Sequence, residues 1–357
     1  MSHRFHNPVR IVAGLGALDA LPDLLGRRRA LILTFPGADA LGLVAPLRER
    51  LGGRLAGVIE SVTPNPDIAD LAALHPLVWS HDADVLIALG GGSVIDSAKA
   101  MLAGVADFGV IVRSLRDGGR FEARHHKTLI AVPTTAGTGS EVTPWATVWD
   151  RALQRKYSLH LDCTWPEAAV VDPTLMRGLP ESVTVQSGLD ALSHALEAIW
   201  NRHANPVSDA LAVAAARAIL ATLPALCRAP GDLALREAMA VAALQAGLAF
   251  SNTRTALAHS MSYPMTLRHG LPHGIACSFT LPQVARLAIG RNAARDAVLA
   301  DALGSLEAAP ARLEAFLHAL GVRTRFSDYG VDDDEAASLL ADALVGDRGR
   351  NFIGAAA

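Results

Sequence analysis

The sequence predicts a two-part architecture, in which an α/β domain with a parallel sheet precedes an all-helical domain. Up to about residue 180, short aliphatic runs alternate with helical patterns, which is typical of βαβ units whose strands are buried on both faces. From 184 to 357 the chain is instead rich in Ala and Leu at helical spacing. We therefore expect one domain over 1–180 and another over 181–357, with Gly178–Pro180 marking the boundary.

Each strand of the expected sheet is a short, almost continuously apolar run. These runs lie at 30–34, 57–60, 85–89, 129–132 and 169–171. Helical spacing predicts a helix over 38–51, after the turn at Pro36 and Gly37, and a second helix over 67–81.

Length, charge and cysteine content exclude several classes of protein. The chain has 357 residues, 51% of them hydrophobic and 19% charged, with a net charge of −3. Single cores stop growing near about 250–300 residues, so two domains are expected. A near-neutral balance without long basic runs argues against nucleic acid as a partner. Cys163, Cys227 and Cys277 are widely spaced without a CxxC pair, which indicates a reducing cytoplasm.

The high apolar content does not by itself imply a membrane partner. A spanning helix needs about 18 uninterrupted apolar residues. Arg217 interrupts the alanine-rich run at 210–223, and Gln245 interrupts the next run. The first residues carry basic side chains and no apolar signal core. We expect a cytoplasmic protein with no membrane partner.

A glycine loop follows the strand expected at 85–89. Gly90, Gly91, Gly92 and Ser93 precede a helical stretch that continues to Met101. Glycines allow the backbone to approach a ligand closely, and a helix N-terminus offers free N–H groups and partial positive charge. The loop therefore favours a pyrophosphate site of a Rossmann-like domain, although a plain tight turn is the alternative.

A second polar loop follows the strand expected at 129–132. The segment 133–141 contains three threonines, a serine and two glycines. This composition suits ribose, phosphate or carboxamide contacts near the carboxyl ends of parallel strands. The simpler alternative is a capped helix start, with Thr138 or Ser140 as the N-cap.

A possible metal site lies in the helical half. Asp190 and His194 are four residues apart in a helical stretch, so both side chains lie on one face. An ordinary surface Asp–His pair would explain these two alone. His259 and His273 complete an Asp plus three His set, which suits Zn²⁺ or Fe²⁺ with positions open for a substrate oxygen. A chance cluster of core histidines is the alternative.

Together these motifs make the chain resemble the iron-containing (group III) alcohol dehydrogenase family over nearly its whole length. The resemblance rests on GGGSVIDSAKA at 90–100, PTTAGTGSEVT at 133–143, DALSHALEA at 190–198, the Pro64–Pro66 loop, the Val171–Pro173 segment and the His259/His273 pair. It implies the dehydroquinate synthase-like fold of that family. It also implies a metal-dependent, NAD(P)-linked enzyme that interconverts an alcohol and an aldehyde in an interdomain cleft, assembled as a homodimer.

The resemblance assigns roles residue by residue. It places the metal, Fe²⁺ or Zn²⁺, on Asp190, His194, His259 and His273. Along the nicotinamide cofactor it places Asn65, Gly91, Gly92, Ser93, Thr134, Thr135, Thr138, Thr143 and Lys156. The metal would polarise the aldehyde oxygen while the nicotinamide supplies hydride. Cys277 is expected to pack in the core.

Two departures from the family pattern affect these assignments. The segment 33–37 lacks the Asp that often holds the ribose 2′-OH in NAD-preferring members, so both NAD(H) and NADP(H) stay open. Four residues after His259, this chain has Tyr263 where many members have a second His. We therefore expect Tyr263 or His269 as the proton donor to the alkoxide.

The stretches 134–150 and 252–282 resemble the phosphonoacetaldehyde reductase branch, which reduces an anionic two-carbon aldehyde. Arg254 and Arg268 flank the metal histidines and would suit phosphonate oxygens; the alternative is that they neutralise helix ends or pair with Asp or Glu. The alternative functions are a maleylacetate-reductase-like enzyme, another short-chain alcohol dehydrogenase of the same family, and a dehydroquinate-synthase-like lyase.

Overall fold

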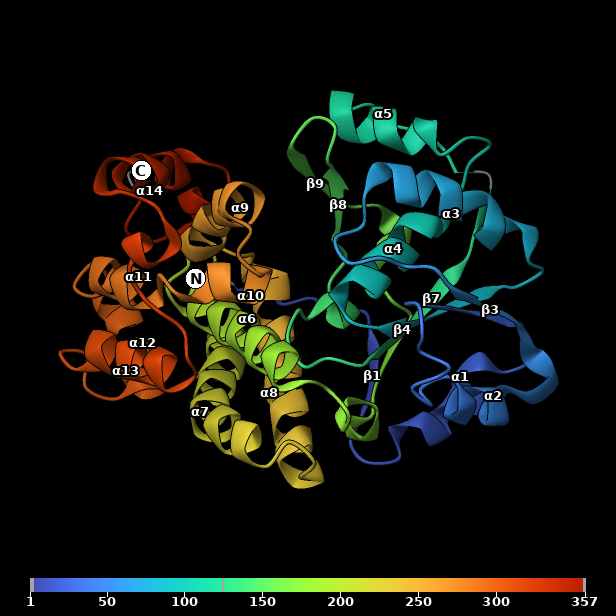
Figure 1. Ribbon diagram of the computed structural model, residues 1–357, viewed down its shortest axis with the longest axis horizontal. Helices are drawn as coiled ribbons and strands as arrows, with labels where there is room; N and C mark the ends of the chain where they lie inside the picture. The colour runs from blue at the N-terminus through green and yellow to red at the C-terminus, as the bar shows by residue number, and fades with distance from the viewer. Residues whose placement is uncertain (1–2, 124, 356–357) are drawn as a thin grey trace. The chain divides into compact units, whose positions relative to one another are not determined.

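The computed structural model describes residues 3–123 and 125–355, which form two compact units. The α/β unit comprises 8–135 and 140–176, and the helical unit comprises the remaining segments, 136–139 among them. The main division falls between Met176 and Arg177, whereas the sequence placed the boundary after residue 180. The α/β architecture followed by helices confirms the expected fold class (Figure 1).

Six parallel strands form the sheet of the α/β unit. Their order is β1 (Arg10–Ala13), β10 (Ala168–Val171), β7 (Thr128–Pro133), β4 (Val85–Gly90), β2 (Ala30–Thr34) and β3 (Leu55–Glu60). The register pairs Ala30 with Val85 and Val85 with Thr128, so the carboxyl ends of these strands lie at one edge. The chain moves outward from β2 to β3 and returns to β4 on the other side of β2. Ligands of doubly wound sheets bind at such a reversal.

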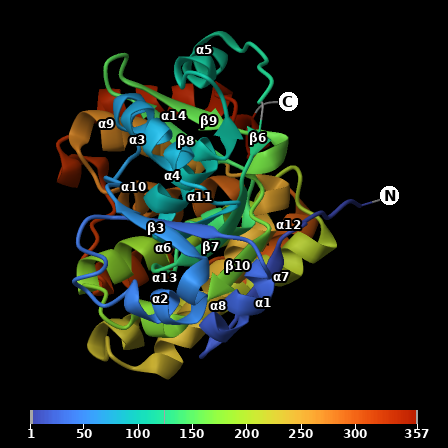
Figure 2. The ribbon, with the colours of Figure 1, turned by 90° about the vertical axis from the view of Figure 1, so that its right-hand side faces the viewer.

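Both faces of this sheet are covered, because its central strands β2, β4 and β7 are almost entirely apolar and buried. Alternate residues, such as Leu31 and Ile32 on β2, belong to different core clusters. One cluster includes α3 (Ile68–Ser80), α4 (Gly92–Met101) and α5 (Gly109–Asp117), and the other includes α1 (Leu21–Leu25) and α2 (Ala45–Leu51). Figures 1 and 2 show the two groups of helices on opposite sides of the strands.

The prediction of a helix over 38–51 is wrong for residues 38–44. Residues 35–44 form turns, and α2 begins only at Ala45. Gly37 and Gly42 take φ values of 86° and 76°, a left-handed conformation that interrupts a right-handed helix. The helix expected over 67–81 is present as α3, with the Asp67 side chain capping its N-terminus.

The antiparallel hairpin of β8 (Ala146–Asp150) and β9 (Arg155–Leu159) was not predicted. Its turn contains no glycine, and Gln154 takes the left-handed φ of 51°. Hairpin turns are normally recognised by Gly or Asn at that place, so the sequence carried no signal. A short pair, β5 (Ala103–Gly104) and β6 (His125–His126), forms a separate ladder.

Three long helices form the centre of the helical unit and pack on one another. They are α6 (Glu181–Ile199), α7 (Pro206–Arg228) and α8 (Leu233–Thr253). A Cβ on Gly188 of α6 would lie 2.8 Å from the Leu223 side chain of α7, so glycine permits this close packing. The later helices are α9 (Leu257–His269), α10 (His273–Ser278), α11 (Leu281–Ala288), α12 (Ala293–Leu303), α13 (Ala309–Ala319) and α14 (Asp333–Val345).

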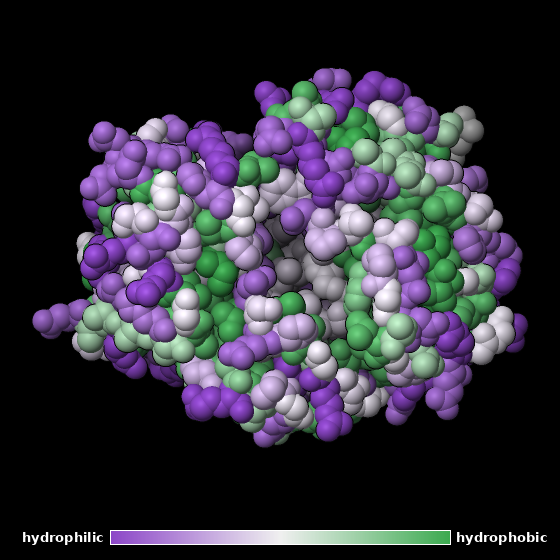
Figure 3. All heavy atoms as spheres, in the orientation of Figure 1, coloured by the Kyte–Doolittle hydropathy of each residue, from purple (hydrophilic) through white to green (hydrophobic). Residues whose placement is uncertain are grey.

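By length and composition alone, α7 and α8 could each cross a membrane. Both nevertheless carry buried charges bound to other parts of the helical unit. Asp209 of α7 pairs with Arg295 at 2.6 Å, and Arg236 of α8 donates to the Thr184 hydroxyl. Such contacts are typical of core helices. On the face drawn in Figure 3, hydrophilic residues are interspersed with apolar ones.

Candidate metal centre and cofactor loops

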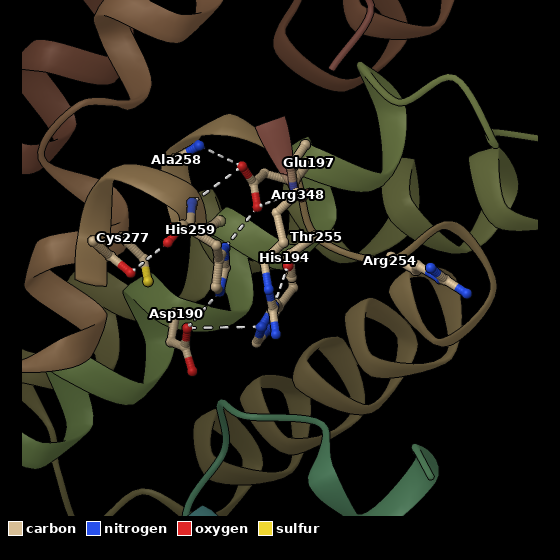
Figure 4. A network of polar contacts seen from close by, with 12 residues as sticks. Asp190, His194, Glu197, Arg254, Thr255, Ala258, His259, Cys277 and Arg348 are labelled. Carbon is tan, nitrogen blue, oxygen red and sulfur yellow. Dashed lines mark hydrogen bonds and ion pairs between the residues drawn. The ribbon is translucent and has the colours of Figure 1, made fainter. Parts of the chain in front are cut away.

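The four expected metal ligands lie together around one carboxylate oxygen. Asp190 Oδ1 is 3.8 Å from His194 Nε2, 3.4 Å from His259 Nε2 and 4.0 Å from His273 Nε2 (Figure 4). Asp190 and His194 lie one turn apart on α6, whereas the other two imidazoles come from α9 and from the first residue of α10.

A glycine brings the last of these histidines to the site. A Cβ on Gly274 would lie 1.9 Å from the Gln186 carbonyl oxygen, so α10 packs its backbone directly on α6. Only glycine allows this approach. His273, the preceding residue, is thereby held beside Asp190 with one third of its side chain exposed.

Two of the imidazole rings are oriented by contacts on their other nitrogen. His194 Nδ1 lies 3.3 Å from the Gly137 carbonyl oxygen, to which it donates, and its ring stacks between Phe250 and His259. His259 Nδ1 donates to Glu197 Oε2 at 2.6 Å. Both rings therefore direct Nε2 toward Asp190, which is how metal-binding histidines are held.

Glu197 is a functional residue that sequence reasoning missed. It is fully buried on α6 and also accepts hydrogen bonds from the backbone N–H groups of Ala256 and Ala258. These bonds fix the segment that leads into His259. Burial works to raise the pKa of Glu197, but the neighbouring His259 and the hydrogen bonds hold it below its usual value. Its spacing of seven residues from Asp190 puts both on one face of α6, which was an available signal.

The electrostatics of the cluster suit a cation. Burial lowers the pKa of His194 to about 4, so its imidazole is neutral at ordinary pH. Burial opposes ionisation of Asp190, but the three imidazoles around it lower its pKa below the usual value. Metal ions bind neutral imidazole and ionised carboxylate, so a metal would also displace the proton that, against burial, neighbouring Cys277 and Glu197 favour on His259 by raising its pKa.

Two buried polar atoms test whether these residues fit a metal ion. Within the part of the chain that the structure describes, Asp190 Oδ1 and His259 Nε2 are both buried without a hydrogen-bond partner. Buried polar atoms are almost always satisfied, so the pair indicates an absent ligand. Adjacent donors of a tetrahedral Zn²⁺ site lie about 3.4 Å apart. The observed separations of 3.4–4.0 Å approach that value, so the residues fit a divalent ion.

In the α/β unit, the glycine loop joins β4 to α4 at the reversal point of the sheet. A Cβ on Gly90 would lie 2.4 Å from the Val94 side chain, and one on Gly91 would lie 3.2 Å from the Thr135 hydroxyl. Glycine is therefore required at the first position and favoured at the second. The N-terminus of α4 follows directly, which leaves backbone N–H groups directed at a ligand.

The Pro64–Pro66 loop contacts the glycine loop. Asn65, with a left-handed φ of 57°, donates its backbone N–H to Ser93 Oγ at 3.1 Å. The structure thus brings two of the expected cofactor residues together. Asn is among the residues that tolerate this backbone conformation.

The threonine loop divides between the two units. Thr134 donates its N–H to the Gly90 carbonyl at 3.1 Å, whereas the segment 136–139 belongs to the helical unit. A Cβ on Gly139 would lie 2.6 Å from Gly247 Cα of α8, so the segment packs closely on that helix. Within this segment, Thr138 lies beside the Gly137 carbonyl that orients His194.

Thr143, another expected cofactor residue, contacts a buried lysine that sequence reasoning did not single out. Lys99 of α4 is fully buried and donates to Ser140, Trp145 and the Thr143 hydroxyl over 2.7–3.4 Å. Thr143 is thus committed partly to this network. Lys156 of β9 lies with its ammonium 5.5 Å from the Trp149 ring centre.

The residues expected for proton donation and anion binding differ in their position relative to the metal cluster. Tyr263 follows His259 by one turn of α9. His269 lies ten residues after His259, about 15 Å along the helix, and contacts Glu335 at 3.1 Å. Arg268 is exposed in the same last turn, and Arg254 is exposed with its side chain pointing away from the ligands in Figure 4. The structure therefore brings only Tyr263 close to the cluster.

Comparison with known proteins agrees with this site. The iron-containing alcohol dehydrogenase model matches residues 8–173, and the Fe-containing alcohol dehydrogenase C-terminal model matches residues 184–352. The chain belongs to the iron-containing alcohol dehydrogenase family. It is therefore an oxidoreductase of the alcohol dehydrogenase type, with a metal and NAD(H) as cofactors.

Individual relatives cover almost the whole chain. The NAD-dependent methanol dehydrogenase of Bacillus methanolicus is 33% identical over 95% of this chain and 93% of its own. The 1,3-propanediol dehydrogenase of Klebsiella pneumoniae is 32% identical over 87% and 81%. The structure of sulfoacetaldehyde reductase from Bifidobacterium kashiwanohense in complex with NAD⁺ has a TM-score of 0.91 at 28% identity, over 99% and 94%. These names favour an oxidoreductase over the lyase alternative.

Proposed function

We propose that the protein reduces a small anionic aldehyde to its alcohol, with phosphonoacetaldehyde and its product 2-hydroxyethylphosphonate as the pair that the sequence resemblance suggests. The observation that carries this proposal is the position of one arginine, Arg348, beside the metal cluster. The similar sulfoacetaldehyde reductase acts on an aldehyde of the same size with a sulfonate group, which supports an anionic substrate.

Asp190, His194, His259 and His273 would hold the metal. A bound divalent ion supplies Lewis-acid polarisation of the aldehyde oxygen. The protein's own part is orientation: Gly137 and Glu197 fix the rings of His194 and His259 before the substrate arrives. Preorganisation of this kind avoids rearrangement during the reaction.

For the cofactor, we propose that Gly91, Gly92 and Ser93 bind the pyrophosphate, and that Asn65, the threonine loop and Lys156 border the nicotinamide half. The choice between NADH and NADPH depends on the end of β2. Thr34 there donates its hydroxyl to the Leu89 carbonyl, and the next carboxylate, Asp39, pairs with Arg48 at 2.8 Å. With that carboxylate engaged, we expect NADPH to be accepted alongside NADH.

Arg348 provides a cation beside the metal cluster. Its guanidinium donates to the Thr255 hydroxyl at 2.6 Å and lies with Cζ 5.3 Å from the ring centre of Tyr263 (Figure 4). Thr255 immediately precedes the segment that Glu197 binds, and Tyr263 lies one turn after His259. The guanidinium is therefore held to the same segment and helix as a metal ligand.

The charge of Arg348 is not neutralised by an acid. Among the ion pairs within 3–123 and 125–355, none involves Arg348. A guanidinium without a carboxylate partner is suited to bind phosphonate or sulfonate oxygens in a forked geometry. Arg254 and Arg268, which the sequence suggested for this role, are exposed.

Steady-state kinetics with matched aldehydes tests the proposal. The Arg348→Ala variant should raise KM for phosphonoacetaldehyde by about 10–100-fold, the value of a charged hydrogen bond, and leave KM for propanal nearly unchanged. Arg268→Ala is the control and should change neither. Equal effects of Arg348→Ala on both substrates would overturn the anionic assignment, and the same assays with NADH and NADPH measure the cofactor preference.

We further propose that Tyr263 assists protonation of the product alkoxide. The position of Tyr263 one turn from His259 supports this role. A Tyr263→Phe variant should lower kcat and alter the pH profile of kcat.

We also propose that the enzyme works in the cytoplasm as a homodimer. The three widely spaced cysteines support a reducing compartment. Sedimentation of the purified chain should report a dimer.

A further inference from the structure

A thiol lies at the metal cluster, where the sequence predicted a core residue. Cys277 follows His273 by one turn of α10, so both side chains lie on the same face. It is fully buried, and its Sγ is 3.5 Å from His273 Nε2. Ligand atoms of Asp190, His259, His273 and Cys277 all lie within 4.8 Å of one another.

An independent observation indicates that these atoms face a common ligand. Asp190 Oδ1 and His259 Nε2 are buried without hydrogen-bond partners in the described part of the chain, and both belong to the group that includes Cys277. The thiol is therefore not the only donor directed at this position. Its neighbours there are two polar atoms that a cation would satisfy.

The separations match those of a mixed site. With Zn–S and Zn–N bonds of about 2.3 and 2.1 Å, sulfur and nitrogen donors around a five-coordinate ion lie about 3.1 Å apart at an angle of about 90° and about 3.8 Å apart at about 120°. The Cys277–His273 distance of 3.5 Å falls within this range, and the Asp190–His259 distance is 3.4 Å. His194 Nε2 lies 3.8 Å from Asp190 Oδ1, although it is outside the group of mutually close ligand atoms that contains Cys277.

We propose that Cys277 is a fifth protein ligand of the metal and that its sulfur biases the centre toward Zn²⁺ over Fe²⁺. When the metal binds, the thiol proton is released to solvent and a sulfur–metal bond forms, with no change in oxidation state. Soft thiolate ligands favour Zn²⁺, whereas a site of one carboxylate and three imidazoles serves either ion. This inference rests on the metal centre of the proposed function.

Cobalt substitution tests the sulfur ligand directly. Co²⁺ added to the metal-free protein should produce a thiolate-to-cobalt charge-transfer band in the near ultraviolet. The band should persist in the Cys163→Ser/Cys227→Ser double variant, which keeps only the thiol in question. It should disappear in both Cys277→Ser and Cys277→Ala. Because these variants differ in polarity, loss of the band in both would not be explained by a folding defect of one of them.

Metal competition provides a second readout that does not depend on activity. Against a chromophoric chelator, Cys277→Ser should bind Zn²⁺ about 10–100-fold more weakly, with a smaller loss for Fe²⁺. A Co²⁺ complex of the double variant without the charge-transfer band, or unchanged Zn²⁺ affinity in Cys277→Ser, would overturn the inference while leaving the metal centre intact. A wild-type protein that binds no metal would overturn both.

Discussion

The two units each bury a cluster of charged side chains, but only one cluster is satisfied by the protein alone. In the α/β unit, the Lys99 ammonium has four oxygen partners, and Asp96 accepts from Ser140 and from the backbone of Thr147. In the helical unit, Asp190 Oδ1 and His259 Nε2 have no hydrogen-bond partner in the described residues.

The comparison separates two uses of buried charge. A closed network such as that of Lys99 needs nothing further, so it fixes the loop 140–145 against α4. Buried polar atoms without hydrogen-bond partners are unfavourable. An open cluster such as that of Asp190 therefore lowers the stability of the folded state until a ligand binds. Mutations in the first cluster should therefore change stability, and mutations in the second should change metal binding.

The largest expected effect comes from breaking the open cluster. His273→Ala should lower metal content and activity together, with activity falling about 10³-fold if the Lewis acid contributes several kcal/mol. Because His273 is partly exposed, the fold should persist. Metal analysis and aldehyde-dependent NADH oxidation measure the two quantities, with the exposed His318→Ala as control. Full activity in a metal-free variant would exclude the site.

Breaking the closed cluster should affect folding instead. Lys99→Met leaves Asp96 without its cation and should reduce the free energy of unfolding by about 3–5 kcal/mol. Urea denaturation measures the loss, and hydrogen exchange should localise it to β4 and β7. Lys156→Met, at a partly exposed site, should change stability by less than about 0.5 kcal/mol. Equal stability of the two variants would contradict this view of the network.

The partner of a metal ligand should have an intermediate effect. Glu197→Gln removes the charge that holds His259 Nδ1 and should weaken metal affinity by about 10–100-fold. Glu335→Gln is a matched control, because Glu335 also contacts a histidine of α9. Chelator competition gives both affinities. A loss shared by the two variants would point to a general effect on α9.

A pH dependence is also expected in the α/β unit. Burial raises the pKa of Glu141 from 4.5 to about 7, so the folded state binds more protons than the unfolded state between these values. Stability from this group is full below pH 4.5 and is lost as pH rises through 7, by about 3 kcal/mol in all. Glu141→Gln should flatten that decline in denaturation curves. An unchanged slope would show that Glu141 titrates normally.

The sequence predicted most of the sheet because strands buried on both faces must be largely apolar, as 30–33 and 85–89 are. It predicted that Asp190, His194, His259 and His273 form one cluster because an Asp and three His in an apolar helical half are chemically unusual, and the structure brings these side chains together. The helix start at Ala45 was missed, since two left-handed glycines decide it. The β8–β9 turn was missed because Gln154 gives no turn signal.

Other parts of the site depend on tertiary contacts that no local pattern reveals. Arg348 lies on a segment far along the chain from α9, and only folding brings it to Thr255. Lys99 lies within the recognised glycine motif, but its role depends on Ser140 and Trp145 in another loop. Arg254 and Arg268 are close to the ligands in sequence and yet exposed in the structure.

The contact between Gly274 and Gln186 has a consequence for how such sequences evolve. Any larger residue at position 274 would push α10 away from α6 and withdraw His273 from Asp190. A descendant could thus keep all four ligand residues and still lose the ion through one methyl group. We therefore expect the small size of Gly274 to matter for the ion as much as the histidine beside it.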